Sequence, residues 1–446
     1  MLRCAPWMAS ICLSGVLLAQ QPGAPGEPAA NPAAQKLTDR LAAVVDRKTP
    51  AERQAGVAEL LSYSGELDAW LDACRRFGTF ASLAAGAGTH TQDLQVLDQV
   101  ESTELHLFVP KSYDPAKPAP LLLWAHGQGG TGKTQWRLWR DTAEQLGMLV
   151  LAPRDPNTGL GFSKKPRERA AALAALRWVR RIANVDENAV FVGGWSRGGH
   201  LAWDLMLRHP DLFAGALPVV GGPLMELTAA GNLRYLENIA HLPIRDLQGS
   251  GDDPRLLRNL HLAFASLKKL RAKNAELIEF ADLRHSAKLE AVDWAEFFSQ
   301  HRRAASPKSV VRVAAELGEA RQAWLQITDF SRRVEAAPQP QVDARRWQRM
   351  DEAKQAAFLL KALGKHTARL EVVSQGNGRF QADGFGVTKF ALLLCEGQIG
   401  KKGKVQVRLG RRTIKRTVEP SAEVLLRDFV ECFDRTRLPV VRIDIP

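Results

Sequence analysis

Residues 190–200 read Val-Phe-Val-Gly-Gly-Trp-Ser-Arg-Gly-Gly-His and predict a strand, a sharp turn and a helix. The apolar start is typical of a buried strand, and a Gly-x-Ser-x-Gly motif centred on Ser196 follows it. The glycines allow the backbone to turn so sharply that the serine hydroxyl stands clear of the sheet. The backbone N–H of Arg197 would then face a developing oxyanion. The stretch therefore predicts that Ser196 is a nucleophile, if the rest of the chain supplies its partners.

Strand-like and helix-like patterns alternate on both sides of this stretch, from about residue 91 to residue 304. Apolar runs predict strands at 104–109, 121–125, 148–152, 213–220, 242–247 and 277–280. Spacings of three and four between apolar residues predict helices at 134–146, 167–182, 255–274 and 294–303. Repeated units of this kind favour an α/β fold, in which a mostly parallel sheet has helices on both faces.

Two regions with different patterns of apolar residues flank this predicted catalytic domain. Residues 37–90 have mainly helical spacing and form a helical lead-in, with a Gly/Ala-rich loop expected at 84–91. Residues 308–446 contain strand-like runs separated by turns, and their helical pattern is mostly confined to 344–363. The sequence therefore predicts a separate, β-rich C-terminal domain.

The N-terminus has the features of a targeting segment. Arg3 precedes a short apolar run at 11–18, and Ala19 is followed by residues rich in Gln, Pro, Gly and Ala. This pattern predicts a signal peptide at 1–19, a linker at 20–36 and an exported protein, periplasmic or secreted. A buried N-terminal helix is the alternative. The apolar run is too short for a comfortable transmembrane span, and no other stretch is apolar enough for one.

The composition fits a soluble globular protein of two or three domains. Of the 446 residues, 45% are hydrophobic and 24% charged, which excludes global disorder. The formal net charge of +13 permits anionic partners without specifying them. Without the signal peptide three cysteines remain, and they show neither a CxxC motif nor a spacing to His that suits zinc. Cys395 and Cys432 either pair in an oxidising compartment or both stay free.

A nucleophilic serine needs a base and an acid that orients the base, and parallel sheets place such residues at the carboxyl ends of strands. The run Gln-Gly-Ser-Gly-Asp-Asp-Pro at 248–254 directly follows a predicted strand. Asp252 is the preferred orienting acid. Asp253 remains the alternative, and either carboxylate would also suit a turn or a helix cap.

His285 is the predicted base. It follows the last predicted strand of the region and precedes the closing helix. It also completes the order Ser, Asp, His that this fold class uses. The other histidines, including His200, His209, His241 and His301, lack this placement and are interpreted as ordinary surface or packing residues.

The loop 126–132, His-Gly-Gln-Gly-Gly-Thr-Gly, is the predicted source of a second oxyanion donor. Its glycines let the backbone approach a substrate oxygen, so the N–H groups of Gln128 and Arg197 are the expected pair. His126 is expected to pack or hydrogen-bond beneath the loop.

The same loop has a competing interpretation. Residues 127–134 satisfy G-x-x-x-x-G-K-[ST], the pattern of a phosphate-binding P-loop, with Lys133 on phosphates and Thr134 on magnesium. No later strand ends in a convincing metal carboxylate, and export would place the domain where ATP is scarce. A nucleotide-binding function therefore remains the less favoured alternative.

These motifs together resemble the α/β-hydrolase superfamily over residues 94–303. The resemblance is to exported esterases of the polyhydroxybutyrate-depolymerase, feruloyl-esterase and dienelactone-hydrolase kind, with prolyl-oligopeptidase-type domains as cousins. The residues that carry it are the opening strand pair at 108–115 and 120–127, the nucleophile elbow at 194–199, the acid loop at 249–252 and the histidine loop at 285–286. Gln248, where the group often has His, and the doubled Asp are departures that leave the choice between Asp252 and Asp253 open.

The resemblance implies a serine esterase that needs no cofactor or metal and forms an acyl-enzyme at Ser196. Its substrate would be a small-molecule or polymer-linked ester. The alternatives are a serine peptidase of the prolyl-oligopeptidase type and a non-catalytic binding protein with a decayed hydrolase domain.

The C-terminal region contains a dense run of basic residues at 401–416 on a predicted hairpin. Such a run can bind an anionic polysaccharide or an acidic cell surface. A solvated sheet face, whose charges keep an edge soluble, is the simpler alternative. Nucleic acid is not an expected partner because the run lacks the interleaved aromatic residues of a base-stacking platform.

Overall fold

The computed structural model describes residues 32–156, 162, 165–339, 341 and 343–446. The predicted signal peptide at 1–19 lies outside the described residues and stays a prediction. Helix α1 spans Pro32–Val45, so the last five residues of the expected linker are helical instead. In the described part of the chain, no helix is both long and apolar enough to cross a bilayer.

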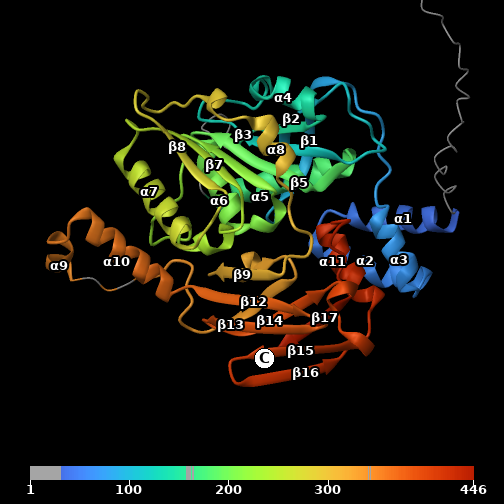
Figure 1. Cartoon of the computed structure of the whole chain (residues 1–446). Helices are drawn as coiled ribbons and strands as arrows, with labels where there is room; N and C mark the ends of the chain where they lie inside the picture. Colours follow the sequence, from blue (N-terminus) through green and yellow to red (C-terminus); the bar gives the residue numbers. More distant parts are fainter. Residues whose placement is uncertain (1–31, 157–161, 163–164, 340, 342) are drawn as a thin grey trace, which may run out of the picture.

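An eight-stranded sheet forms the centre of the predicted catalytic domain (Figure 1). Its order is β1-β2-β4-β3-β5-β6-β7-β8, and all neighbouring pairs from β4 to β8 are parallel, whereas β1 and β2 are antiparallel to their neighbours. The strands are β1 (Gly86–Val96), β2 (Gln99–Val109), β3 (Ala119–Ala125), β4 (Leu149–Pro153), β5 (Val185–Trp195), β6 (Gly215–Val219), β7 (Ile244–Gly249) and β8 (Ala275–Phe280). The prediction of a mostly parallel sheet is confirmed.

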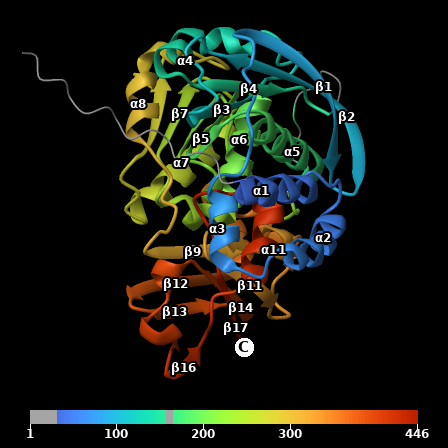
Figure 2. The same cartoon turned by 90° about the vertical axis from the view of Figure 1, so that its right-hand side faces the viewer.

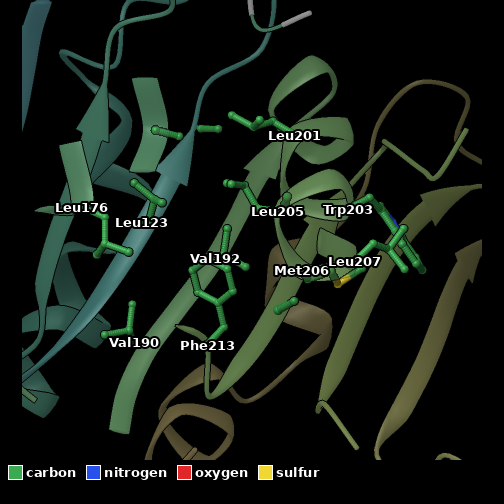
Figure 3. Close-up of a cluster of buried hydrophobic side chains, with 14 of the residues drawn as sticks. Leu123, Leu176, Val190, Val192, Leu201, Trp203, Leu205, Met206, Leu207 and Phe213 are labelled. Carbon is green, nitrogen blue, oxygen red and sulfur yellow. The ribbon is translucent and has the colours of Figure 1, made fainter. Parts of the chain in front are cut away.

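Helices cover both faces of this sheet because its central strands are apolar on both sides. On one face, Leu123, Val190 and Val192 pack against Leu176 and Leu201 of the covering helices (Figure 3). On the other face, alternate residues of the same strands form a separate aromatic-rich core. The helices of the first face are α5 (Pro166–Ile182), α6 (Arg197–Arg208) and α7 (Pro254–Lys269), and those of the second are α4 (Arg140–Leu146) and α8 (Trp294–Gln300).

The first strand corrects one expectation. The loop predicted at 84–91 is wrong, because β1 begins at Gly86 and pairs along its whole length with β2. Few large apolar residues mark its start, and the pairing with β2 supplies the backbone hydrogen bonds that hold it extended. Residues 86–90, expected in the helical lead-in, therefore belong to the catalytic sheet.

The C-terminal region contains two more sheets, ordered β10-β11-β14-β17 and β16-β15-β13-β12-β9. Their strands are β9 (Ser309–Ala314), β10 (Arg321–Gln322), β11 (Leu325–Phe330), β12 (Ala368–Gly376), β13 (Arg379–Phe385), β14 (Val387–Leu394), β15 (Lys404–Leu409), β16 (Arg412–Thr417) and β17 (Val441–Ile445). Helices α9 (Ala344–Gln348) and α10 (Glu352–Lys365) occupy the predicted helical stretch. Helix α11 (Ala422–Cys432) was not predicted, although its buried residues follow helical spacing.

The helical lead-in and the C-terminal region share one hydrophobic core. Helices α2 (Pro50–Tyr63) and α3 (Leu67–Arg75) lie with α1 beside α11 (Figures 1 and 2). Trp70 of α3 is fully buried in the same cluster as Phe429 of α11 and Leu392 of β14. The two ends of the described chain therefore form one packed unit beneath the catalytic sheet.

The three cysteines of the described residues are free thiols. Cys395 and Cys432 are partly buried and unpaired, and Cys74 is buried. Of the two alternatives for Cys395 and Cys432, the structure has the unpaired one.

Candidate active site

Ser196 lies at the tight turn between β5, which ends at Trp195, and α6, which begins at Arg197. Its φ of 56° is in the left-handed region that a residue with a side chain rarely adopts. The Ser196 N–H donates to the carbonyl of Val219 on the neighbouring strand at 2.8 Å, which holds the turn in place. Strained backbone of this kind is typical of functional positions.

The glycines around Ser196 are required by close packing. A side chain at Gly198 would overlap the Ala125 carbonyl oxygen at the end of β3. A Cβ at Gly194 would lie 2.5 Å from the Gly198 carbonyl carbon, and one at Gly199 would lie 2.6 Å from the Val219 oxygen. The glycines therefore let α6 start directly against the ends of β3 and β6, where Ser196 faces the loops.

His285 lies after β8, and its Nε2 is 2.7 Å from Ser196 Oγ. About half of the imidazole is exposed to solvent. Its loop is tied to the loop after β7, because the Gly251 N–H donates to the Leu283 carbonyl at 2.9 Å. A side chain at Gly249 would overlap the Arg284 carbonyl oxygen, so this glycine is what allows the two loops to lie together.

Asp252 completes a hydrogen-bonded chain with His285 and Ser196. Its Oδ2 is 2.8 Å from His285 Nδ1, and its Oδ1 accepts the Asp253 N–H at 2.7 Å. The carboxylate is 7% exposed, so its bond to the imidazole is shielded from competing water. The structure thus brings together the three residues that the sequence places at the ends of three strands.

Asp253 has a different task. Its Oδ1 accepts the N–H groups of Arg255 at 2.7 Å and Leu256 at 3.3 Å and so caps the N-terminus of α7. These hydrogen bonds lower the pKa of the Asp253 carboxyl below its usual range, the one from Arg255 most. Of the two aspartates, only Asp252 reaches the imidazole.

Gln248 stands where the group that the sequence resembles often has His. It is fully buried on β7, and its side-chain amide donates to Asp252 Oδ2 at 2.6 Å. The same carboxylate oxygen therefore receives hydrogen bonds from both Gln248 and His285. The sequence offered one signal for this contact, since Gln248 lies four residues before Asp252 on the same strand-to-loop segment.

The loop that carries the predicted oxyanion donor Gln128 lies beside Ser196, and the other predicted donor, Arg197, follows Ser196 in the chain. A Cβ at Gly127 would be 3.4 Å from Ser196 Cβ, so the loop after β3 directly adjoins the hydroxyl. The Gly130 N–H donates to the Gly127 carbonyl at 3.2 Å and closes a turn around Gln128. Among the described residues, the backbone N–H groups of Gln128 and Arg197 have no hydrogen-bond partner and are free to donate to a substrate oxygen.

His126 supports this loop from below. It is fully buried, with Nδ1 2.7 Å from the Gly127 carbonyl, and its Nε2 accepts the Asp155 N–H at 3.2 Å. Burial lowers the pKa of His126 below its ordinary value, so the ring is neutral and donates from Nδ1 to the loop. As expected, it holds the loop from beneath.

The P-loop interpretation of residues 127–134 does not fit the backbone. A phosphate loop leads directly into an α-helix whose first N–H groups face the phosphates. Here residues Gln135–Leu138 form a short 3-10 turn, and α4 begins only at Arg140.

Curated proteins that are similar to the chain in sequence include NocK and AMT4. NocK of Nocardia uniformis subsp. tsuyamanensis, which is named as an esterase, is 26% identical over 258 residues, 54% of this chain and 65% of its own length. The thioesterase AMT4 of Alternaria alternata is 32% identical over 129 residues, 29% of this chain and 46% of its own length. The chain is therefore similar, over part of its length, to proteins named as an esterase and a thioesterase. It spans less than two thirds of either relative.

Solved structures that the chain matches include a thermostable esterase and the acylaminoacyl peptidase of Pyrococcus horikoshii. The esterase is 22% identical, with a TM-score of 0.37, and the match covers 49% of this chain and 63% of that one. The peptidase is 14% identical, with a TM-score of 0.40, and the match covers 49% of this chain and 42% of that one. No protein-family profile matches the chain.

Proposed function

We propose that this chain is an α/β-hydrolase and a serine esterase, which cleaves a carboxylic ester through an acyl-enzyme formed at Ser196. The observation that carries the proposal is the continuous hydrogen-bonded chain from Ser196 Oγ to His285 Nε2, at 2.7 Å, and from His285 Nδ1 to Asp252, at 2.8 Å. This is the arrangement in which a serine hydroxyl passes its proton to a base while it attacks a carbonyl carbon.

Each residue has one role in the proposed reaction. Ser196 Oγ attacks the ester carbonyl, and its proton moves to His285 Nε2 while Asp252 stabilises the imidazolium. The N–H groups of Gln128 and Arg197 donate to the oxyanion of the tetrahedral intermediate. His285 then gives its proton to the departing alcohol, and the acyl group stays on Ser196. A water molecule, deprotonated by His285, releases the carboxylic acid and restores the serine.

An ester rather than a peptide is the preferred substrate because both curated relatives carry esterase or thioesterase names. The open position of His285 suits a small or polymer-linked ester, since the half-exposed imidazole leaves room for a leaving alcohol of any size. A serine peptidase would use the same residues, so the substrate panel must contain both bond types.

The central test is turnover of short p-nitrophenyl esters. The Ser196→Ala variant is expected to lose at least about 10³-fold in kcat, because the nucleophile is removed. A Ser299→Ala variant is the matched control, since Ser299 lies on the exposed side of α8 and bonds only to the Glu296 carbonyl. Full activity of Ser196→Ala, or failure of a fluorophosphonate probe to label the folded wild type, would overturn the proposal.

A second panel compares esters with aminoacyl p-nitroanilides of the same acyl group. Higher kcat/KM on the esters is expected, and higher kcat/KM on the anilides would replace the esterase by a peptidase. Either preference is compatible with the proposed roles of Ser196, His285 and Asp252. The panel therefore tests the class of substrate without testing the mechanism.

A further inference from the structure

The basic run of the C-terminal region forms one wall of a groove of about 650 Å³. Six cationic side chains line this groove, and the lining contains no carboxylate. They come from three separate segments of the chain: Arg379 of β13, Lys401, Lys402 and Lys404 before and at the start of β15, and Lys415 and Arg416 of β16. We call this site the basic groove.

Strand pairing places two of these cations, Arg379 and Lys415, in one row across the sheet. Arg379 pairs with Gln406 of β15, and Gln406 pairs with Lys415 of β16. Directly paired residues share a face of a sheet, so the three side chains project together. The neighbouring Val405 is buried on the opposite face. The row therefore crosses the strands on a surface that the core holds in register.

Two tight turns fix the end of the basic groove. The Gln406 N–H donates to the Gly378 carbonyl at 2.7 Å, and the Gly400 N–H donates to the Lys404 carbonyl at 3.1 Å. A Cβ at Gly400 would lie 2.7 Å from the Asn377 oxygen, so the turns touch backbone to backbone. Such packing limits the movement of the groove wall before any ligand arrives.

The cations of the basic groove are unneutralised. Among the described residues, none of the six forms an ion pair, although arginines elsewhere in the same domain do, as in Arg369 with Glu237 at 2.6 Å. All six side chains are exposed. Like charges crowded on one face repel each other, and an anionic ligand would remove that repulsion.

The remaining lining residues select among anionic partners. Asn377, Gln406 and Thr417 offer amide and hydroxyl groups that can hydrogen-bond to sugar hydroxyls. The lining contains no aromatic residue for base stacking, and its one large apolar residue, Val405, is buried and unable to enter a membrane. This chemistry favours a linear polysaccharide that carries sulfate or carboxylate groups.

We propose that the basic groove binds an anionic polysaccharide. Strands β15 and β16 lie at the opposite end of the molecule from the eight-stranded sheet (Figures 1 and 2). A polymer bound there leaves Ser196 free to act, so binding is independent of the proposed esterase reaction.

The test measures binding of the full chain to immobilised polymers at several salt concentrations. Heparin carries sulfates as well as carboxylates, whereas polygalacturonate carries carboxylates alone, so binding to heparin alone would show that sulfate is required. A single-stranded oligodeoxynucleotide and phosphatidylglycerol vesicles represent the other classes of polyanion. Binding to at least one polysaccharide that weakens with salt is expected, because salt screens exposed charges.

The decisive variant is Lys401→Gln/Lys404→Gln/Lys415→Gln, which should raise the Kd for the bound polysaccharide at least about 10-fold at low salt. Its matched control is Lys268→Gln/Lys269→Gln/Lys273→Gln, in which three exposed lysines on and after α7 are removed with the same loss of charge. A second variant, Arg379→Gln/Arg416→Gln, should also weaken binding. Melting temperatures and turnover of a p-nitrophenyl ester should match the wild type in all variants.

Three outcomes would overturn the proposal. Equal weakening in the groove and control variants would mean that only the net charge attracts the polymer. Tighter binding to the oligonucleotide or the vesicles than to either polysaccharide would assign the groove to another class of partner. No binding to any polymer by the folded, esterolytic chain would leave the groove as a solvated face, without affecting the proposed reaction.

Discussion

Asp252 and Asp253 are neighbours in the chain, but their carboxylates have separate partners. Asp252 accepts hydrogen bonds from His285 and Gln248, whereas Asp253 caps α7. An acid that orients the base must hold its imidazole in one tautomer, and only Asp252 is placed to do so. A pair of matched substitutions can therefore separate catalysis from capping at adjacent positions.

Asp252→Asn is expected to lower kcat on a p-nitrophenyl ester by about 10³- to 10⁴-fold, because the amide cannot stabilise the imidazolium. Asp253→Ala should leave kcat almost unchanged and lower the melting temperature, because α7 loses its cap. Steady-state kinetics and thermal unfolding of the two variants provide the check. The reverse result, with Asp253→Ala the inactive variant, would assign the orienting role to Asp253.

Asp246 is a second acid of β7 with an unusual environment. It is fully buried, and its Oδ2 accepts the Trp203 indole N–H at 2.7 Å. Burial raises the pKa of the Asp246 carboxyl well above its ordinary value, and Glu279 adds to the rise. The folded chain therefore keeps this proton to a higher pH than the unfolded chain, in which an aspartate releases it at about pH 4. The stabilisation that this proton gives to the folded state is complete below the pKa of Asp246 in the unfolded chain. It is lost as the pH rises toward the higher pKa of Asp246 in the folded chain.

Asp246→Asn keeps the acceptor for Trp203 and removes the titration. Between pH 5 and pH 8, the free energy of unfolding of the wild type should therefore fall more steeply than that of the variant. Urea unfolding at several pH values measures both slopes. Asp93→Asn, at an exposed position of β1, is the control and should run parallel to the wild type. Equal slopes for Asp246→Asn and the wild type would contradict the prediction.

At the scale of elements, the turn between β5 and α6 depends on close contact with β3. Gly198 lies in the first turn of α6, where any side chain would meet the Ala125 carbonyl. Polar backbone atoms cannot yield as a flexible side chain can, so α6 would have to move away from the sheet. The hydroxyl of Ser196 and the N–H of Arg197 would move with it.

Gly198→Ala is expected to destabilise the chain by at least about 2 kcal/mol and to lower kcat, because the added methyl group displaces the elbow. Gly364→Ala is the control, since Gly364 lies in α10 with open space around its Cα. That substitution should stabilise by about 0.5–1 kcal/mol through helix propensity. Urea unfolding and ester turnover measure both, and a tolerated Gly198→Ala would show that α6 is not held as described.

At the scale of the whole molecule, buried ion pairs join the catalytic sheet to the C-terminal region. Asp204 of α6 pairs with Arg208 at 2.9 Å and with Arg169 of α5 at 2.5 Å. Both arginines also pair with Glu319, which belongs to the short turn Leu317–Glu319 after β9. Burial raises the pKa of Glu319, but Arg208 and Arg169 outweigh it, so the net shift is downward. The charged network therefore clamps α6 from the C-terminal side.

Glu319→Gln should lower the free energy of unfolding by about 3–5 kcal/mol, because it leaves two buried guanidinium groups short of a partner. The difference in free energy of unfolding between the wild type and the variant should decrease as the pH falls through the pKa of Glu319 in the folded chain. Below that pKa, Glu319 of the wild type is protonated and, like Gln, carries no charge. Glu396→Gln is the control, since Glu396 faces Arg75 at 3.8 Å on the surface and contributes under about 1 kcal/mol. Equal losses of unfolding free energy for the two substitutions, measured in urea, would contradict the prediction that the ion pairs of Glu319 stabilise the fold.

Local pattern alone predicts Ser196, His285 and the loop that carries Asp252 and Asp253. Each of these residues lies in a loop that directly follows a readable apolar strand, and parallel strands bring their carboxyl ends to one edge of a sheet. Strand β1 and helix α11 escaped prediction for different reasons. Strand β1 is held extended by its pairing with β2. The buried residues of α11 follow helical spacing, but the segment lies between strand-like runs that favour a strand there.

The sequence by itself determined the α/β sheet and its order of loops, because periodicity and glycine spacing report the local backbone. Only the tertiary structure decided which aspartate meets His285, that Gln248 holds it, and that α1 to α3 share a core with α11. The basic groove likewise exists only where β13, β15 and β16 pair. These features join residues distant in the chain, and local pattern carries no information about which distant segments will touch.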